Sequence, residues 1–215
     1  MSIDHRARVL LIDDHPLLRS GLRQLIDANQ RLLVCAEAAT PDEAILHLKQ
    51  QDPDLCILDL HLRGASGLDL LPVLLHHAPH LKVLVLSMLD ERVYAERCLR
   101  LGAKGYLMKE TAADQVVSAL TAIEAGGTWL GPTAQAPGQQ GKLPVETLSD
   151  RELRVFELTG DGLPTRAIAS RLTLSEKTVE AHKANIKKKL GIEHGTELAR
   201  LAMSWRESGG SAPKV

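Results

Sequence analysis

The chain has 215 residues and a formal net charge of −1, which allows one large domain or two small ones, each with its own hydrophobic core. Its apolar stretches are all shorter than the ~20 residues that span a bilayer, and its first residues lead directly into a strand pattern. We therefore expect neither a membrane segment nor a secretory signal. The three cysteines, Cys35, Cys56 and Cys98, lie far apart in apolar runs, which indicates reduced thiols in a cytoplasmic protein.

Charge is distributed unevenly along the chain. Residues 1–140 contain 13 Lys/Arg and 17 Asp/Glu, whereas residues 141–215 contain 13 and 10. An acidic first part and a mildly basic second part fit a regulatory module joined to a nucleic-acid-binding module. The asymmetry is modest, so the division depends on the motifs described below.

Residues 8–125 alternate strand patterns with helical patterns, which is typical of α/β proteins. The expected strands are Arg8–Ile12, Leu32–Ala38, Leu55–Asp59, Lys82–Ser87 and Gly105–Met108. The expected helices are Pro16–Asn29, Pro41–Gln51, Gly67–His77, Glu91–Leu101 and Ala112–Ala125. Five such units with right-handed crossovers predict an α/β fold of the flavodoxin-like kind, with a doubly wound five-stranded parallel sheet.

The composition changes after this region. Residues 127–146 are rich in Gly, Pro and Gln and predict a flexible linker, whose start Trp129 is expected to attach to the first domain. From Leu148 onward the pattern is purely helical, and Ser149 with Glu152 forms a capping box at a helix start. The sequence thus predicts a first domain of residues 1–126, a linker of residues 127–146 and a small all-α four-helix domain of residues 147–215.

Charged residues follow three of the expected strands. Asp13 and Asp14 follow the first strand, Asp59 ends the third, Lys109 follows the fifth, and the hydroxyl residue Ser87 ends the fourth. In open α/β sheets, ligands bind beyond the carboxyl ends of the strands. Any one of these residues alone is an ordinary loop residue, but chance rarely places four charges at the ends of three strands that the fold brings together.

This set of residue types suits phosphoryl transfer. Converging carboxylates repel one another unless a cation lies among them. Mg²⁺ prefers oxygen ligands and keeps several waters, which leaves room for phosphate. A carboxylate can attack phosphorus to form an acyl phosphate, while a metal and a lysine offset the charge of the transferred group. The sequence therefore predicts a phosphoryl-accepting site that uses Mg²⁺.

Residues 8–126 resemble the receiver domains of bacterial two-component response regulators, most closely at Gly102–Lys109 (GAKGYLMK). The resemblance implies that Asp59 is the phosphoacceptor. It implies that the metal ligands are Asp13, Asp14, Asp59 and the backbone carbonyl of His61. It also implies that the residues that bind the phosphoryl group or act as the switch are Lys109, Ser87 and Tyr106. The Ser87 hydroxyl is expected to move towards a phosphoryl oxygen and to vacate space for rotation of Tyr106.

Three positions depart from the receiver pattern. Arg63 stands where proline is usual, Ser66 where Asp or Asn is frequent, and Glu110 where proline often follows the lysine. None removes a group that the reaction needs. His61, two residues beyond Asp59, has two open interpretations: it tunes the lifetime of the phosphorylated state, or it is a solvated loop histidine.

The second domain contains two helical patterns around a tight turn, Thr165–Arg171 and Glu176–Leu190, which are the core of a helix-turn-helix. The second helix holds five lysines and two glutamates, with Val179 and Ile186 on its inward stripe. Charge alone would also fit a solvated surface helix. Lysines near a DNA groove contribute phosphate contacts, and side chains from the first turns of such a helix reach base edges.

The ordered residues of this region resemble the LuxR-type DNA-binding domain, for example in Leu148-Ser149-x-Arg151-Glu152 and Ser175-x-x-Thr178-Val179-x-x-His182. With the receiver, the whole chain resembles a NarL/FixJ-type response regulator. Departures are Glu180, often lysine in relatives, Ala184, often basic, Pro164, often serine, and Ala167, often glutamate. Glu180 either accepts a hydrogen bond from a cytosine amine or faces solvent.

The expected DNA-contacting residues are Lys177, Thr178, Glu180, Lys183, Lys187 and Lys188. The resemblance implies a cytoplasmic transcription factor, not a classical enzyme, that a sensor histidine kinase phosphorylates. It further implies that the phosphorylated protein forms a homodimer, binds double-stranded promoter DNA and contacts RNA polymerase. Two alternatives stay open: a receiver that serves as a dimerisation or ligand-sensing scaffold without phosphorylation, which the complete acidic set disfavours, and a phosphotransfer intermediate or aspartyl-phosphatase, which the DNA-binding motif disfavours.

Overall fold

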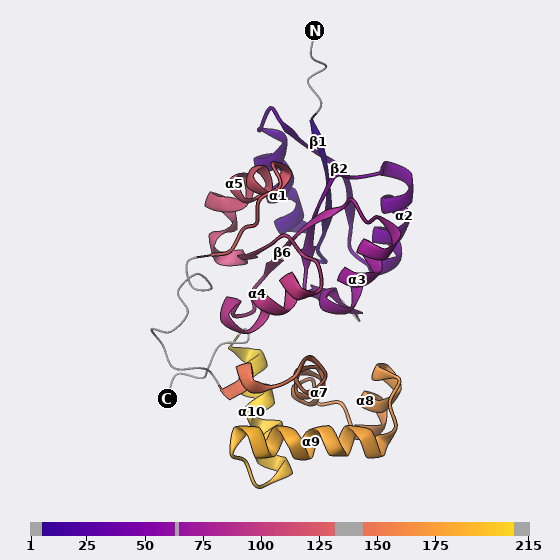
Figure 1. Ribbon diagram of the computed structural model, residues 1–215, viewed down its shortest axis with the longest axis vertical. Helices are drawn as coiled ribbons and strands as arrows, with labels where there is room; N and C mark the ends of the chain where they lie inside the picture. The colour runs from indigo at the N-terminus through magenta and orange to yellow at the C-terminus, as the bar shows by residue number, and fades with distance from the viewer. Residues whose placement is uncertain (1–5, 63–64, 132–143, 209–215) are drawn as a thin grey trace. The chain divides into compact units, whose positions relative to one another are not determined.

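The computed structural model of the protein describes residues 6–62, 65–131 and 144–208. The chain forms two compact units, Met1–Ala136 and Pro137–Val215. The first unit is α/β and the second is helical (Figure 1). Within the described residues, no helix is both long and apolar enough to cross a bilayer.

The first unit contains a five-stranded parallel sheet with strand order β2-β1-β3-β6-β7. The strands are β1 (Ala7–Ile12), β2 (Leu32–Ala38), β3 (Leu55–Asp59), β6 (Lys82–Ser87) and β7 (Gly105–Met108). The strand order reverses direction beside β1, where β2 lies on one side and β3 on the other. The predicted doubly wound sheet is confirmed, and its switch point lies at the carboxyl ends of β1 and β3.

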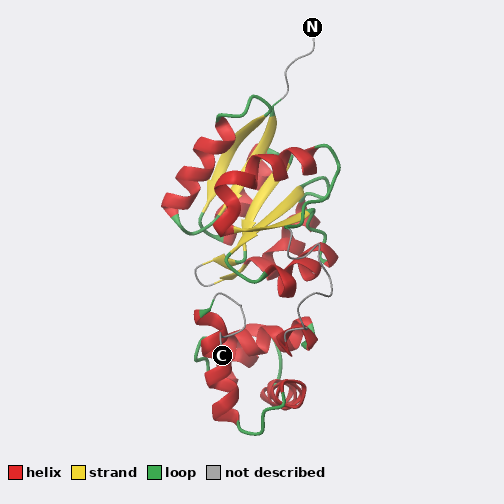
Figure 2. Ribbon diagram, turned by 90° about the vertical axis from the view of Figure 1, so that its left-hand side faces the viewer, coloured by secondary structure: helices red, strands yellow, loops and turns green. Residues whose placement is uncertain are grey.

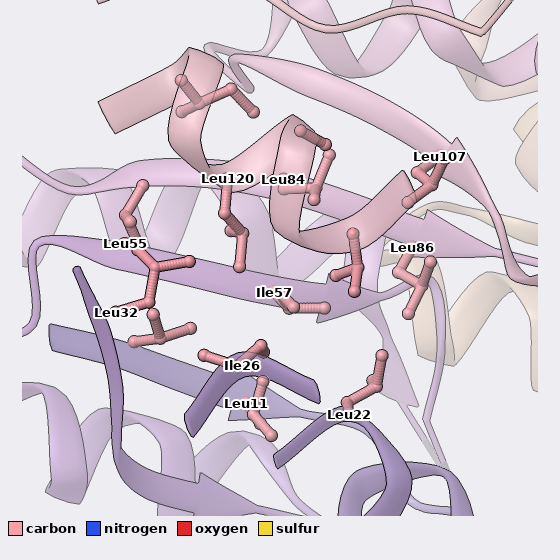
Figure 3. Packing of buried hydrophobic residues seen from close by; sticks show 14 of the residues in the cluster. Leu11, Leu22, Ile26, Leu32, Leu55, Ile57, Leu84, Leu86, Leu107 and Leu120 are labelled. Carbon is pink, nitrogen blue, oxygen red and sulfur yellow. The ribbon is translucent and has the colours of Figure 1, made fainter. Parts of the chain in front are cut away.

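Helices cover both faces of the sheet (Figure 2). They are α1 (Pro16–Asp27), α2 (Pro41–Gln51), α3 (Gly67–His77), α4 (Glu91–Arg100) and α5 (Ala112–Glu124). Leu22 and Ile26 of α1 and Leu120 of α5 pack on alternate strand residues such as Leu11 and Ile57 (Figure 3). Because every second residue of a strand points to the same face, the residues between them pack against the opposite helices.

The structure confirms all five expected strands and all five expected helices of this unit, with small differences at their ends. Helix α1 ends at Asp27 and not at Asn29. Ala28 caps it, and the N–H of Asn29 donates to the Ile26 carbonyl, three residues back and not four. At the start of α2, the Thr40 side chain caps the helix by accepting from the N–H of Glu43 at 3.3 Å. The Glu43 carboxylate accepts from the N–H of Ala39, one residue before the cap, at 2.7 Å.

Two features of this unit were not predicted from the sequence. A short antiparallel hairpin, β4 (His61–Leu62) and β5 (Ala65–Ser66), follows β3, and the 3-10 turn η1 (Lys109–Thr111) precedes α5. Arg63, one of the positions that depart from the receiver pattern, lies outside the described residues.

Trp129 attaches to the first unit, as expected. It forms a parallel bridge with Gly105, donates its backbone N–H to the Lys104 carbonyl and accepts from the N–H of Tyr106 at 2.9 Å. Two residues further on, the N–H of Gly131 donates to the buried Glu91 carboxylate. Residues 132–143 of the expected linker lie outside the described residues.

Over residues 144–208, the part of the second unit that the structure describes, four α-helices follow the 3-10 turn η2 (Pro144–Thr147), which confirms the all-α expectation. The helices are α7 (Asp150–Gly160), α8 (Thr165–Leu172), α9 (Glu176–Leu190) and α10 (Gly195–Glu207). Phe156 of α7 and Trp205 of α10 pack edge to face in its core, with 6.4 Å between their ring centroids. The predicted capping box of Ser149 and Glu152 is present in full, and Gly191 ends α9 in the left-handed conformation with φ 68°.

Candidate functional site

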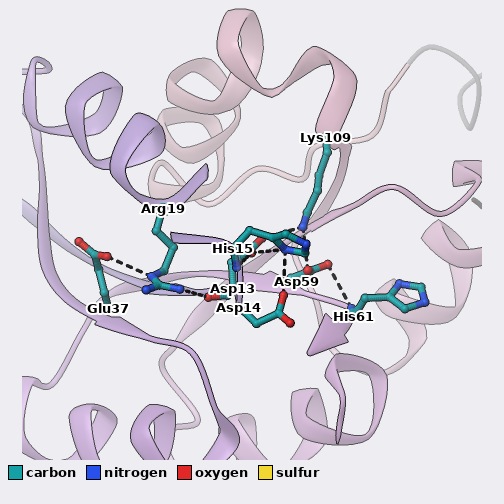
Figure 4. Close-up of polar contacts among 8 residues, drawn as sticks. All are labelled: Asp13, Asp14, His15, Arg19, Glu37, Asp59, His61 and Lys109. Carbon is teal, nitrogen blue, oxygen red and sulfur yellow. Dashed lines mark hydrogen bonds and ion pairs between the residues drawn. The ribbon is translucent and has the colours of Figure 1, made fainter. Parts of the chain in front are cut away.

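The fold brings together the charged residues that the sequence places at strand ends. Ile12 of β1 is paired with Leu58 of β3, so the residues that follow, Asp13 and Asp59, lie at the same edge of the sheet. The Lys109 ammonium enters from the end of β7 and lies 2.7 Å from Asp13 Oδ2 and 2.7 Å from Asp59 Oδ2 (Figure 4). One cation therefore contacts two carboxylates.

The cluster of Asp13, Asp59 and Lys109, called the pocket below, is almost completely buried. The side chains of Asp13, Asp59 and Lys109 are 2%, 1% and 8% exposed. Burial, the largest influence, raises the pKa of the Asp59 carboxyl although the Lys109 ammonium opposes it. Burial would lower the pKa of the Lys109 ammonium, but Asp59 and Asp13 outweigh it and raise that pKa. The lysine is therefore charged, while the carboxylates are incompletely neutralised.

Residues beside the pocket orient its carboxylates. Asp13 Oδ1 accepts from the backbone N–H of His15 at 2.7 Å, and His15 Nδ1 lies 3.0 Å from Asp13 Oδ1 and 2.8 Å from Asp14 Oδ1. The Arg19 guanidinium donates to the backbone carbonyl of Asp13 and also pairs with Glu37 at 3.1 Å. The sequence reasoning did not single out His15 or Arg19, because their partners are defined only by the turn that follows β1.

The same pocket fits a divalent cation. Asp13, Asp14, His15 and Asp59 each offer one ligand atom, and these atoms lie within 4.8 Å of one another. Carboxylate oxygens are the preferred ligands of hard divalent cations. Three carboxylates lie together and Lys109 contacts two of them, so a divalent cation would complete the charge balance of the pocket.

His61 is positioned differently from the carboxylates. Its backbone N–H donates to Asp59 Oδ1 at 3.1 Å, whereas its exposed imidazole is turned away from the carboxylates (Figure 4). The predicted role of its backbone carbonyl as a metal ligand stays a prediction. Asp59 thus has both carboxylate oxygens occupied, one by His61 and the other by Lys109.

The two expected switch residues form hydrogen bonds to the backbone of one residue, Leu89. Ser87, fully buried at the end of β6, accepts from the backbone N–H of Leu89 at 3.2 Å. The Tyr106 hydroxyl, fully buried on β7, donates to the carbonyl of the same Leu89 at 2.8 Å. Burial raises the pKa of Tyr106 well above its ordinary value, so its hydroxyl keeps its proton. The two residues therefore hold the loop between β6 and α4 from both sides.

Gly67 is a further residue of the site that sequence reasoning missed. It begins α3, and its N–H donates to the Leu60 carbonyl at 2.9 Å. An added Cβ there would lie 2.0 Å from the backbone carbonyl oxygen of Asp59. A residue with a side chain would therefore displace the end of β3, which carries Asp59.

In the second unit, α8 and α9 form the predicted helix-turn-helix. Val179 and Ile186 of α9 are buried, as expected for its inward stripe, and Ser175 caps the helix by accepting from the N–H of Thr178 at 3.0 Å. Pro164 leaves the start of α8 without a side-chain cap. The exposed residues on α9 are Glu176, Lys177, Glu180, Ala181, Ala184, Asn185, Lys188 and Lys189.

The lysines of α9 differ in what they contact. Lys183 donates to Thr165 Oγ1 at 2.6 Å and lies 3.4 Å from Glu180 Oε1, and its side chain is 19% exposed. Lys189 pairs with the buried Glu152 at 2.6 Å and supports the packing of α9 on α7. Lys187 reaches the Glu193 carbonyl at 3.5 Å. Lys177 and Lys188 extend from the exposed face.

A doubly wound α/β unit with a buried carboxylate–lysine pocket, followed by a helix-turn-helix unit, defines a DNA-binding response regulator of two-component systems. Residues 9–121 match the family described as response regulator receiver domain, and residues 146–202 match bacterial regulatory proteins of the luxR family. The chain belongs to the NarL/LuxR family of response regulators and is not a classical enzyme.

Curated relatives agree along nearly their whole length. The transcriptional regulatory protein UhpA of Escherichia coli is 35% identical over 192 residues, which cover 89% of this chain and 95% of UhpA. The nitrate/nitrite response regulator protein NarL of Escherichia coli is 33% identical over 207 residues, which cover 93% of this chain and 96% of NarL.

Solved structures give the same result. RcsB from Salmonella enterica serovar Typhimurium, bound to a promoter in the presence of the phosphomimetic BeF₃⁻, matches with a TM-score of 0.74 and 25% identity over 93% of this chain and all of that chain. A structure of two RcsB dimers bound to two parallel DNAs matches with a TM-score of 0.60 and 25% identity, over 91% of this chain and 97% of that chain.

Proposed function

We propose that a sensor histidine kinase transfers a phosphoryl group to Asp59, and that this event promotes pairing of two copies of the protein and binding to promoter DNA through α9. The protein then regulates transcription in the cytoplasm through contact with RNA polymerase. The observation that carries this proposal is the position of Lys109, which contacts Asp59 and Asp13 in a buried pocket.

The proposed transfer needs one attack and one departure. A carboxylate oxygen of Asp59 forms a bond to phosphorus, while the bond between phosphorus and the histidine nitrogen of the kinase breaks. The Lys109 ammonium, which contacts Asp59 Oδ2 before the transfer, then pairs with an oxygen of the phosphoryl group. The N–H of His61 keeps the carboxylate oriented from the other side.

We propose that the divalent cation is Mg²⁺. Asp13, Asp14, Asp59 and the backbone carbonyl of His61 would hold it, and His15 lies beside the same carboxylates. When bound, Mg²⁺ supplies positive charge that offsets the negative charge on the phosphoryl oxygens.

We propose that Ser87 and Tyr106 transmit the change through Leu89. A charged phosphoryl oxygen forms a stronger hydrogen bond with the Ser87 hydroxyl than the Leu89 N–H does. The Ser87 hydroxyl therefore turns towards the phosphoryl group. The N–H of Leu89 then loses its partner, and the loop that leads into α4 rearranges together with Tyr106. A change at this surface alters how two receivers pair.

On the DNA, we propose that α9 enters the major groove. Its proposed contacts are Lys177, Thr178, Glu180, Lys183, Lys187 and Lys188, of which Lys177, Glu180 and Lys188 are exposed. We further propose a receiver of residues 1–126, a linker of residues 127–146 and a DNA-binding domain of residues 147–215. The two matched ranges and the two compact units support this division.

Intact-mass spectrometry after incubation with Mg²⁺ and acetyl phosphate tests the acceptor. We expect the wild type to gain one phosphoryl group and Asp59→Ala to gain none. Asp54→Ala, which changes a carboxylate at the opposite end of β3, is a control that should still gain it. Incorporation into Asp59→Ala at the wild-type level would contradict the assignment, and incorporation into neither protein would favour a receiver that works without phosphate.

A further inference from the structure

The exposed face of α9 combines charge and small apolar residues in a defined order. Lys177, Ala181, Ala184 and Lys188 follow one another at spacings of four, three and four, so they form one row along the helix. Glu180 lies beside the two alanines in this row. The middle of the face therefore holds one carboxylate, two methyl groups and the amide of Asn185, and the cations lie at both ends.

Glu180 does not extend freely into solvent. Its Oε1 accepts from the Thr165 hydroxyl of α8 at 2.6 Å, and Lys183 Nζ lies 3.4 Å from the same oxygen. Lys183 also donates to Thr165 Oγ1 at 2.6 Å. The Thr165 hydroxyl thus accepts from the ammonium and donates to the carboxylate, which holds both side chains in one geometry.

This arrangement leaves an acceptor available. Both contacts of the Glu180 carboxylate with described residues fall on Oε1, and 60% of its side chain is exposed, so Oε2 can accept from a molecule outside the domain. The Thr165 hydrogen bond and the Lys183 charge lower the pKa of Glu180, which keeps it ionised. Because the rotamer is already restricted, less conformational entropy is lost when it binds.

We propose that Glu180, positioned by Thr165 and Lys183, reads the exocyclic amine of a cytosine in the major groove and determines the sequence specificity of this protein. This inference rests on the proposed entry of α9 into the groove. Ala181 and Ala184 allow the close approach that a carboxylate needs to reach a base edge, since neither side chain extends beyond a methyl group.

The pattern of groups in the major groove explains the choice of cytosine. Guanine presents two acceptors and thymine a carbonyl and a methyl group, and a carboxylate is repelled by these acceptors. Adenine presents an amine next to the N7 acceptor, whose lone pair faces the second carboxylate oxygen. Cytosine presents its amine and no acceptor on the same base, so it fits a carboxylate best.

Selection from a library of randomised duplexes with the full-length protein tests this proposal. We expect the wild type to select a cytosine in each half-site, with replacement of its base pair reducing affinity by about 5- to 100-fold. In Glu180→Gln the preference should shift from cytosine to adenine, because a glutamine amide donates and accepts side by side. Thr165→Val should weaken the preference for cytosine, and Thr165→Ser, which keeps the hydroxyl, should retain it.

Glu176→Gln is the matched control, since it removes the same charge from an exposed position on the same helix. It should raise affinity for all sequences alike and leave base preference unchanged. If Glu180→Gln behaves in the same way, the role of Glu180 as a base reader is excluded. If the wild type selects no sequence and Lys177→Ala leaves the salt dependence of binding unchanged, the placement of α9 in the groove is itself wrong.

Discussion

The Lys109 ammonium lies 2.7 Å from Asp59 Oδ2, although fifty positions separate the two residues in the chain. It lies equally close to Asp13 Oδ2, and both carboxylates are buried. Without a metal, Lys109 is the cation that compensates these two carboxylates. One positive charge does not fully offset two negative charges, so the pocket favours binding of further positive charge.

Replacing Lys109 with methionine should destabilise the receiver in metal-free buffer at pH 8 by about 3 kcal/mol, because it leaves buried carboxylates without their cation. The loss should shrink as pH falls, since the raised pKa of Asp59 lets this carboxyl take up a proton and end the repulsion. Mg²⁺ should restore part of the stability. Hydrogen exchange of peptides from β1, β3 and β6 measures the effect. Lys104→Met, which removes an exposed lysine, is the control, and equal stability of the two variants would contradict the prediction.

Gly67→Ala should destabilise the receiver by at least about 2 kcal/mol, because its Cβ would overlap the Asp59 carbonyl and lie 2.7 Å from Leu60 Cα. Both clashing atoms belong to the backbone, so the end of β3 must move. We also expect slower incorporation of phosphoryl from acetyl phosphate, measured by intact mass. The control is Gly21→Ala in α1, where an added Cβ meets nothing within 4 Å and where alanine should stabilise the helix by about 1 kcal/mol. Normal incorporation in Gly67→Ala would show that β3 tolerates the shift.

Tyr106→Phe should cost about 1 kcal/mol, since it keeps the ring in the core and removes the hydrogen bond to the buried Leu89 carbonyl. The more specific expectation is local. Faster hydrogen exchange should appear in the loop between β6 and α4, because Leu89 then keeps the hydrogen bond to Ser87 but loses the one from Tyr106. Peptides from α2, which follows β2 at the opposite edge of the sheet from β7, serve as the internal control. Unchanged exchange in the loop would mean that Tyr106 does not restrain Leu89.

The sequence predicted the pocket well because strand ends and chemistry coincide there. Apolar runs define β1 and β3, and the parallel sheet then places Asp13 and Asp59 at one edge with no further information. The same logic does not reach Gly67 or Thr165. Their importance depends on atoms from other elements, the Asp59 carbonyl and the Glu180 carboxylate, which no local pattern encodes.

The region after α5 shows how tertiary contacts override composition. Its Gly-rich composition predicts a flexible linker from residue 127, yet Trp129 pairs with the edge strand and Gly131 donates to Glu91. An edge strand offers unpaired N–H and C=O groups, and the Trp129 backbone pairs with two of them, the Tyr106 N–H and the Lys104 carbonyl beside β7. The β4–β5 hairpin escaped prediction for a simpler reason, because two residues in each strand are too few to establish a period.

The helical domain should lose stability in acid in part through the carboxyl group of Glu152. Its side chain is buried, accepts from the N–H of Ser149 at 2.8 Å and pairs with Lys189 at 2.6 Å. Burial alone would raise the pKa of Glu152, but the bonds from Lys189 and Ser149 outweigh it and lower that pKa below the ordinary 4.5. A carboxyl whose pKa is lower in the folded state contributes stability that is present above pH 4.5 and is lost as pH falls through the folded-state value.

Glu152→Gln should therefore cost about 1–2 kcal/mol at pH 7 and almost nothing at a pH where the wild-type carboxyl is protonated. Urea unfolding followed by Trp205 fluorescence measures this difference in a Trp129→Phe background, which removes the other tryptophan of the chain. Glu193→Gln, at an exposed position after α9, is the control and should unfold like its parent at every pH. A constant difference between Glu152→Gln and its parent from pH 7 to pH 3 would mean that packing of the side chain, and not its charge, supports α7 and α9.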